Sequence, residues 1–187
     1  MANATDPVAR QIHGTNPQFL IEKIVRVKAY ETLYWKESCF ALTAETIIDK
    51  AMGLKYVGGT VGTGRAPTPF VCLVLKMLQI QPDQEIIYEY IANDTFKYLR
   101  LLGAFYLRLT GRPADIYRHL EPLLQDYRKI VIKDIHGNAT VTHMDELIDK
   151  MLHDPILFDI ALPRLAKRSY LEDMGLLEPY ESPLGPT

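Results

Sequence analysis

Of all the motifs in this sequence, a glycine-rich stretch has the residue spacing that most resembles a catalytic or ligand-binding site. It reads Gly59-Thr60-Val61-Gly62-Thr63-Gly64-Arg65-Ala66, with glycines placed as in a nucleotide-binding P-loop. A P-loop needs a lysine for the β and γ phosphates and a Ser or Thr hydroxyl for magnesium, but Arg65 and Ala66 occupy those positions. No strand pattern precedes the stretch. We therefore interpret it as a connector or a partner-gripping loop and predict no nucleotide cofactor.

Metal and nucleophilic chemistry lack their residue patterns as well. Zinc needs several converging ligands, and the histidines form no His-x-x-x-His pair and lie at no ligand spacing from a cysteine. Cys39 and Cys72 stand far apart among apolar neighbours, which is typical of buried thiols in a reducing compartment. Carboxylates such as Glu85 and Glu89 recur at helical spacing, which is typical of a solvated helix face. The sequence predicts no catalytic residue, no metal and no enzyme.

Aromatic residues near the N-terminus are candidates for binding a partner. Tyr30, Tyr34 and Trp35 are flanked by charged residues and lie outside the continuous apolar runs. Such rings anchor interfaces because they bury a large apolar area while a polar tip stays satisfied. The pattern is equally compatible with rings that close the edge of the core.

Two groups of basic residues are further candidates for binding acidic protein segments or RNA phosphates. They are Lys97, Arg100 and Arg108 in one predicted helix, and Arg164, Lys167 and Arg168 near the C-terminus. A solvated helix face is the alternative for both. The chain as a whole has 21 basic and 23 acidic residues and a net charge of −2, so it lacks the strong positive field of a dedicated nucleic-acid binder.

The bulk composition predicts one globular domain. The chain has 187 residues, of which 48% are hydrophobic and 24% charged, so it can bury a core without disulfide or metal staples. The first residues are polar and do not read as a secretory signal, so we expect an intracellular protein. The apolar runs are shorter than the ~20 residues of a membrane span.

Helix-start signals recur along the chain and predict an all-α, mostly helical domain over residues 1–175, followed by an extended or disordered tail over 176–187. Asn16-Pro17 predicts a capped helix whose apolar residues Phe19, Leu20, Ile24 and Val27 face the core. Further helices are predicted over 31–40, from Thr43 to Gly53 and from Thr68-Pro69 to Leu78. Asp83 and Asp94 are predicted to cap helices over 84–92 and 95–110. The remaining predicted helices start at Pro113, with a break at Pro122, and span 144–153 and 155–174. Alternating β-branched residues predict one small β-hairpin over 129–143, as the only sheet.

Several blocks of the sequence, taken in order, resemble one known family. They are Ile12 to Glu37, Pro67 to Phe70 continuing to Pro82, Phe96 to Gly111, Asp126 to Ile130, and Leu162 to Leu165. Over about residues 10 to 175 the chain is similar to the N-terminal domain of the pre-mRNA-processing (splicing) factor 38 family.

The resemblance implies a nuclear, non-enzymatic scaffold of the precatalytic spliceosome. Family members associate with the U4/U6.U5 tri-snRNP and are needed for spliceosome activation. The implied partners are helical segments of the microfibrillar-associated protein 1 type and of Snu23, with Prp8, Brr2 and RNA close by, and we expect a monomer in isolation. Direct RNA binding is the alternative function, although no RRM or KH pattern is present. Many family proteins also carry a charged tail after this domain.

Overall fold

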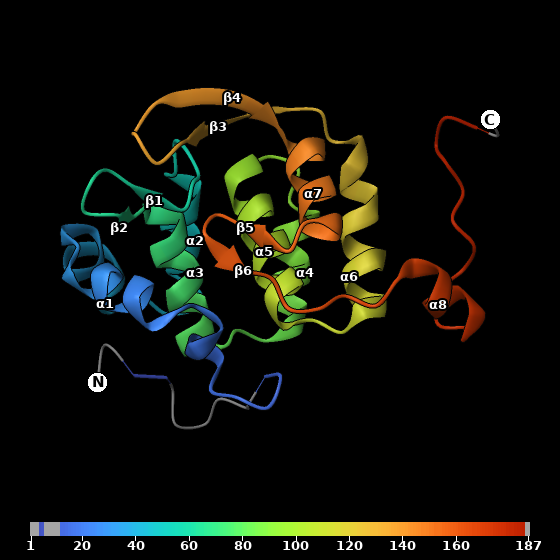
Figure 1. Ribbon diagram of the computed structural model, residues 1–187, viewed down its shortest axis with the longest axis horizontal. Coiled ribbons are helices and arrows are strands. Elements are labelled where there is room, and N and C mark those ends of the chain that lie inside the picture. The colour runs from blue at the N-terminus through green and yellow to red at the C-terminus, as the bar shows by residue number, and fades with distance from the viewer. Residues whose placement is uncertain (1–3, 6–11, 186–187) are drawn as a thin grey trace.

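The protein is mainly helical, with helices α3 and α5 at its centre (Figure 1). The computed structural model describes residues 4–5 and 12–185. The helices are η1 Pro17–Leu20, α1 Lys23–Glu31, η2 Trp35–Cys39, α2 Ile47–Met52, α3 Pro69–Ile80, α4 Gln84–Ala92, α5 Lys97–Thr110, α6 Pro113–Leu120, η3 Glu121–Gln125, α7 Met144–His153 and α8 Arg168–Asp173. The predicted all-α class is confirmed.

Helix α3 is the buried axis of the fold, as the sequence predicts. The Thr68 hydroxyl accepts a hydrogen bond from the Val71 N–H at 3.3 Å, and Pro69 supplies the first helical residue. Every residue from Phe70 to Gln79 is buried, including Lys76. The N-terminal cap and the apolar composition are therefore sufficient to predict this helix from the sequence.

Helices α4 and α5 pack closely because Gly103 has no side chain. A Cβ on Gly103 would lie 2.8 Å from the Cβ of Tyr90 on α4. Helix α5 starts two residues later than predicted, since the side chain of Asn93, and not that of Asp94, accepts the N–H groups of Thr95 and Phe96, each at 3.0 Å. Helix α6 ends before Pro122, where the 3-10 helix η3 takes over, as expected.

The predicted hairpin is present, but it is not the only sheet. Strands β3 Lys129–Lys133 and β4 Ala139–His143 pair antiparallel with Val131 opposite Val141. Two shorter antiparallel pairs also occur in the described part of the chain. They are β1 Thr60–Val61 with β2 Ala66–Pro67, and β5 Ile156–Leu157 with β6 Ile160–Ala161.

The hairpin β5–β6 overturns the helix predicted over 155–174. Phe158 and Asp159 form its turn at φ values of 54° and 60°, and the Phe158 ring is buried against Phe70 and Phe105. The Asp159 carboxylate accepts both the N–H and the hydroxyl of Thr60 at 2.9 Å. Long-range contacts thus stabilise a turn that the residue types alone disfavour. Only α8 remains helical, after an extended segment over 162–167.

The N-terminal helices also differ from the prediction. Asn16 caps Pro17 as expected, but the first element is a short 3-10 helix, and α1 begins afresh at Lys23. Thr32 then ends α1, because its hydroxyl donates to the Ala29 carbonyl at 2.7 Å and accepts the Trp35 N–H. The next element is the π-helix η2, which is shorter than the helix predicted over 31–40.

The chain after α8 packs against the domain at first. Arg118 donates to the Leu176 carbonyl at 2.5 Å, and Leu177 is buried. The division at residue 175 stays a prediction, and residues 1–3, 6–11 and 186–187 lie outside the described part. None of the described helices combines the length and apolar character needed to cross a bilayer.

Candidate partner-binding surfaces

Trp35 is a core residue. Its side chain is 1% exposed, and its ring lies 5.2 Å from that of Tyr30 at an angle of 56°. The ammonium of Lys76 lies 5.5 Å from the centre of the Trp35 ring. For Trp35, the core alternative is therefore right, and a partner cannot reach the ring while the domain is folded.

Tyr30 and Tyr34 are half-buried at the edge of the same core. The Tyr30 hydroxyl donates to Gln18 Oε1 at 2.9 Å, so its polar tip is satisfied. Burial raises the pKa of Tyr34, whose ring lines an open hollow of about 390 Å³ together with Leu54 and Tyr56. Their role in partner binding stays a proposal.

Lys76 is a buried cation with a structural task. It donates to the Phe40 carbonyl at 3.2 Å, at the C-terminal end of the π-helix η2, where a cation complements the orphan carbonyls. Burial lowers the pKa of Lys76. This contact fixes η2 on α3 and leaves the Phe40 side chain pointing out of the core.

The first basic group does not form a free surface. Arg108 is 4% exposed and donates to the Met151 carbonyl at 2.6 Å, across the α5–α7 contact. Arg100 forms an ion pair with Asp126 at 2.9 Å, and Lys97 donates to the Lys129 carbonyl. All three side chains therefore make contacts inside the domain, and the role of Lys97, Arg100 and Arg108 in partner binding stays a proposal.

The second basic group is divided by the structure. Arg168 binds Glu121 at 2.9 Å and also pairs with Glu172, and its guanidinium lies 5.3 Å from the centre of the Tyr180 ring. Arg164 and Lys167 are exposed, and neither has an ion pair or side-chain hydrogen bond within the described residues. Only these two remain open to a ligand.

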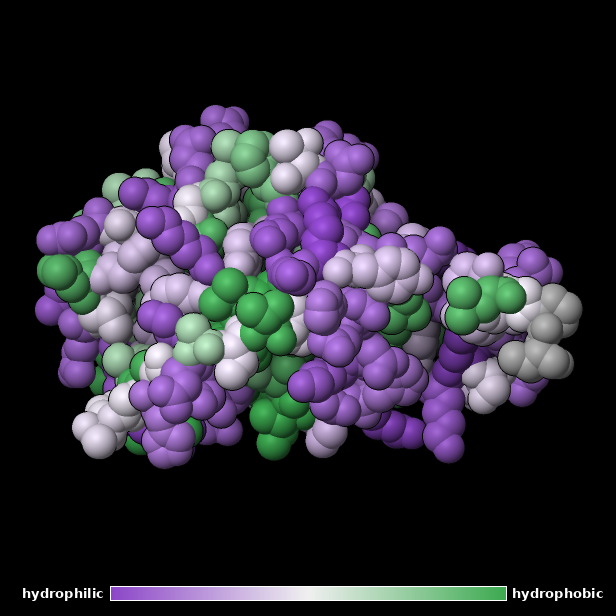
Figure 2. Space-filling model, turned by 90° about the horizontal axis from the view of Figure 1, so that it is seen from above, coloured by the Kyte–Doolittle hydropathy of each residue, from purple (hydrophilic) through white to green (hydrophobic). Residues whose placement is uncertain are grey.

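An exposed apolar surface at the N-terminal end contradicts the prediction that Phe19, Ile24 and Val27 face the core. We call it the N-terminal apolar surface, and it comprises the large exposed apolar residues between positions 19 and 40: Phe19, Ile24, Val27, Leu33 and Phe40. Ile24 and Val27 are 62% and 43% exposed and lie one helical turn apart on α1. Figure 2, which shows the molecule from above, has a small apolar area among mostly polar residues at the left end, where the segment with α1 lies in Figure 1.

The sequence does contain a signal for this surface. Ile21, Val25 and Ala29 are spaced four residues apart and face the core, with Ala29 fully buried. Ile24 and Val27 therefore form a second apolar stripe on the same helix. Helix α1 thus has one apolar stripe that its own domain covers and a second that is exposed, which makes the second a candidate site of association.

Catalytic and metal chemistry find no support in the described geometry. Burial raises the pKa of Cys39 to about 12 and that of Cys72 to about 11, which makes both thiols poor nucleophiles. In the glycine-rich loop, Asp159 already occupies the Thr60 N–H that a phosphate would need. Among the described residues, no three His, Cys, Asp or Glu side chains lie close enough together to hold a metal ion.

The structure is that of a small, mainly helical domain with large apolar side chains exposed near its N-terminal end. Residues 10–175 match the model of the PRP38 family. The chain belongs to this family.

Named relatives agree with this assignment. Pre-mRNA-splicing factor 38 of Arabidopsis thaliana is 60% identical over 98% of this chain and 52% of its own length. Pre-mRNA-splicing factor 38A of Danio rerio is 56% identical over 98% of this chain and 59% of its own length. The chain thus spans somewhat more than half the length of these relatives.

A solved structure has the same fold. It is the crystal structure of the Snu23-Prp38-MFAP1(217-258) complex of Chaetomium thermophilum, in which the matched chain is 40% identical. The TM-score is 0.89, and the match covers 95% of this chain and 93% of that one. The fold of this family member is therefore one that has been seen together with partner proteins.

Proposed function

We propose that this chain is a non-enzymatic scaffold of the precatalytic spliceosome, which acts in the nucleus with the U4/U6.U5 tri-snRNP and binds helical segments of other splicing proteins. Membership of the PRP38 family supports this proposal, as does the likeness to a chain solved in a complex with Snu23 and an MFAP1 segment. We therefore infer Snu23 and MFAP1-type proteins as partners. Proximity to Prp8 and Brr2 rests on the family resemblance alone.

The observation that carries the proposal is the second apolar stripe of α1. Ile24 and Val27 lie one turn apart on the solvent-exposed side of this helix, and Phe19, which is also exposed, packs its ring against the Arg26 guanidinium of the same helix. An amphipathic helix presents side chains with the same i, i+3 and i+4 spacing, so it can cover this stripe by ridge-into-groove packing. Burying an apolar side chain fully contributes about 1.5–3 kcal/mol. Covering these partly exposed residues supplies a useful fraction of that.

Direct RNA binding receives less support. Arg100 and Arg108 are committed to contacts inside the domain, which removes most of the basic stripe on which RNA binding would depend. Arg164 and Lys167, which have no ion pair within the described residues, lie near the C-terminus and form a smaller group.

The test replaces the apolar stripe by charge. The double variant Ile24→Glu/Val27→Glu should bind MFAP1-type and Snu23 segments at least about tenfold more weakly in calorimetric titrations, because a charge cannot be buried under an apolar helix. The matched control is Val141→Glu, since Val141 is 58% exposed on β4. Far-UV circular dichroism should show the same helix content in all three proteins. Equal affinities of the double variant and the control would refute this assignment of the surface.

A further inference from the structure

A second surface lies at the other end of the chain, beside the extended segment over 162–167. An open groove of about 590 Å³ runs between this segment, the start of α6 and the helix α8. We call it the C-terminal groove, and its lining residues are Pro113, Arg164, Leu165, Ala166, Lys167 and Tyr170. Apolar side chains and the exposed Tyr170 ring make its walls, and two cations stand at its edges.

The backbone around the groove is held in place by internal contacts. The Tyr117 hydroxyl on α6 donates to the Ala166 carbonyl at 2.8 Å. The Arg168 guanidinium donates to the Glu121 carboxylate at 2.9 Å, which fixes the start of α8 on η3. A ligand would therefore meet a preformed site and would not have to order this segment on binding.

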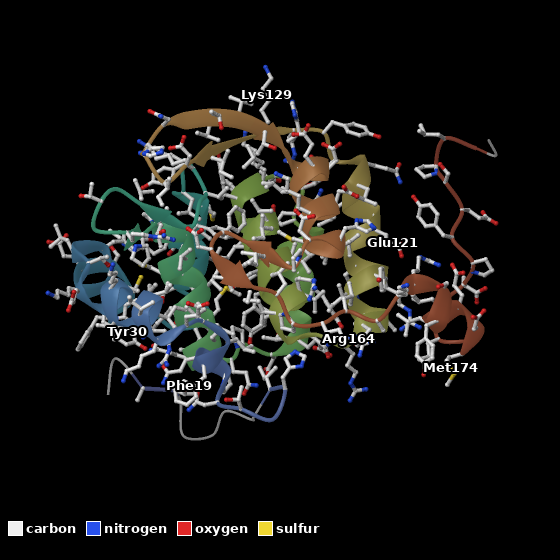
Figure 3. All side chains as sticks on the ribbon, in the orientation of Figure 1. Phe19, Tyr30, Glu121, Lys129, Arg164 and Met174 are labelled. Atoms are coloured by element: carbon white, nitrogen blue, oxygen red, sulfur yellow. The ribbon has the colours of Figure 1, made fainter. Side chains whose placement is uncertain are left out.

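The charges of the groove are uncompensated. Arg164 and Lys167 have no ion pair within the described residues, and no carboxylate lines the groove. Leu165 and Lys167 also line a neighbouring hollow, which contains the carboxylates of Glu121 and Asp149. Arg164 lies on the lower edge of the molecule in Figure 3, opposite Lys129 on the upper edge. The C-terminal groove itself is therefore lined by two cations and no carboxylate, and Lys167 stands between it and the acidic hollow.

We propose that the C-terminal groove binds an acidic segment of a partner protein, which places an apolar side chain on Leu165 and Tyr170 and its carboxylates beside Arg164 and Lys167. Complementary charge at the rim gives orientation, and the apolar walls give affinity. A protein segment fits better than RNA. Two cations beside apolar walls match a short acidic peptide, whereas an RNA backbone needs a longer run of cations.

This groove is separate from the N-terminal apolar surface. The inference rests on the proposed function only in the premise that the chain binds segments of other proteins. A scaffold with two such surfaces would hold two segments at once, one recognised by its apolar face and the other by its acidic character.

The test uses a synthetic peptide with Glu at most positions and Leu or Phe at every third or fourth. Its affinity for the full chain is measured by fluorescence anisotropy, with a Gln-for-Glu peptide and a uridine-rich RNA oligonucleotide as comparison ligands. The variants are Arg164→Glu, Lys167→Glu and Tyr170→Ala. Lys129→Glu is the matched control, because Lys129 is an exposed lysine on the opposite edge of the molecule.

Each charge reversal in the groove should weaken binding of the acidic peptide about three- to tenfold, and Lys129→Glu less than about twofold. Tyr170→Ala should weaken it at least about threefold through lost apolar contact. Added salt should weaken binding, and the Gln peptide should bind less well.

The inference is overturned if the acidic peptide fails to bind at about millimolar concentration, if Arg164→Glu and Lys129→Glu have equal effects, or if RNA binds more tightly and responds to the same groove variants. The variant Ile24→Glu/Val27→Glu should leave the acidic peptide unaffected. If only Ile24→Glu/Val27→Glu weakens binding of the helical partners, the N-terminal apolar surface binds them. If only the groove variants weaken it, the C-terminal groove binds them instead.

Discussion

The carboxylate of Asp126 connects helix α5 to the start of strand β3, and its removal should destabilise the whole domain. The side chain is 7% exposed. It accepts hydrogen bonds from Arg100 Nη1 at 2.9 Å and from Arg128 Nε and Nη2 at 2.9 and 2.7 Å. The Asp126 carbonyl also accepts the Asp145 N–H at the start of α7. Asp126→Asn leaves the fold of the backbone possible but turns an amide N–H₂ toward two guanidinium groups.

The magnitude follows from the pKa. Burial alone raises the pKa of Asp126, but the hydrogen bonds from Arg128 and Arg100 outweigh it and lower the pKa from 3.8 to about 2. Lowering the pKa of Asp126 by nearly two units corresponds to a stabilisation of the folded state by about 2.5 kcal/mol. Arg128 is 35% exposed, so solvent screening reduces this to about 2 kcal/mol. The two arginines left unpaired add to the loss, and we expect the variant to be less stable by about 2–4 kcal/mol at pH 7.

The sign of the pH dependence is fixed by the lowered pKa. Because the folded state binds the Asp126 proton less tightly than the unfolded state does, the stabilisation is complete above about pH 4 and is lost as the pH falls through about 2. By pH 3, about half of the ionisation contribution should be gone. The stability gap between the native chain and Asp126→Asn should therefore narrow on acidification.

Urea unfolding followed by far-UV circular dichroism at pH 7, 5, 4 and 3 measures this gap. The matched control is Asp115→Asn, because Asp115 pairs with the exposed Arg118 at 3.6 Å and should contribute less than about 0.5 kcal/mol. A cost at Asp126 no larger than at Asp115, or a gap that stays constant down to pH 3, would refute the reasoning.

Three further outcomes are expected. Gly59→Ala should cost about 1–3 kcal/mol in thermal unfolding, since its Cβ would lie 2.6 Å from the Phe158 carbonyl oxygen, whereas Gly64→Ala, with open space around it, should be nearly neutral. Trp35→Ala should cost about 3–5 kcal/mol and Phe40→Ala less than about 0.5 kcal/mol, because only the former side chain is buried. Both cysteines should resist iodoacetamide in the folded protein and react once urea unfolds it, as thiol labelling with mass spectrometry would show.

The helices that the sequence predicts well are those with strong local signals. Thr68-Pro69 begins α3, Pro113 begins α6, and the hairpin ending at His143 leads directly into α7, each within the expected bounds. In these places the capping groups and the apolar period lie within a few residues of each other. Local chemistry therefore decides the outcome, and no distant contact opposes it.

The errors arise where a distant residue decides. The turn at Phe158 and Asp159 has positive φ values without Gly or Asn, and it depends on Thr60 and on the buried Phe70. The sequence could not show that Asp126 forms an ion pair with Arg100, because the two residues are far apart in the chain. A continuous helix from Pro17 would place Phe19, Ile24 and Val27 toward the core, but the break before Lys23 changes the phase of the helix and leaves them exposed.

The contact between Asp159 and Thr60 also has a consequence for how the chain reaches its final form. It joins two positions 99 residues apart and closes the glycine-rich loop from the far end of the domain. The pairing of α4 with α5 needs only neighbouring sequence, whereas this closure must wait until residue 159 has left the ribosome, and it brings a large loss of chain entropy. The α-helical centre should therefore assemble early during synthesis, and the joining of the two ends should be the late step that makes the domain a single cooperative unit.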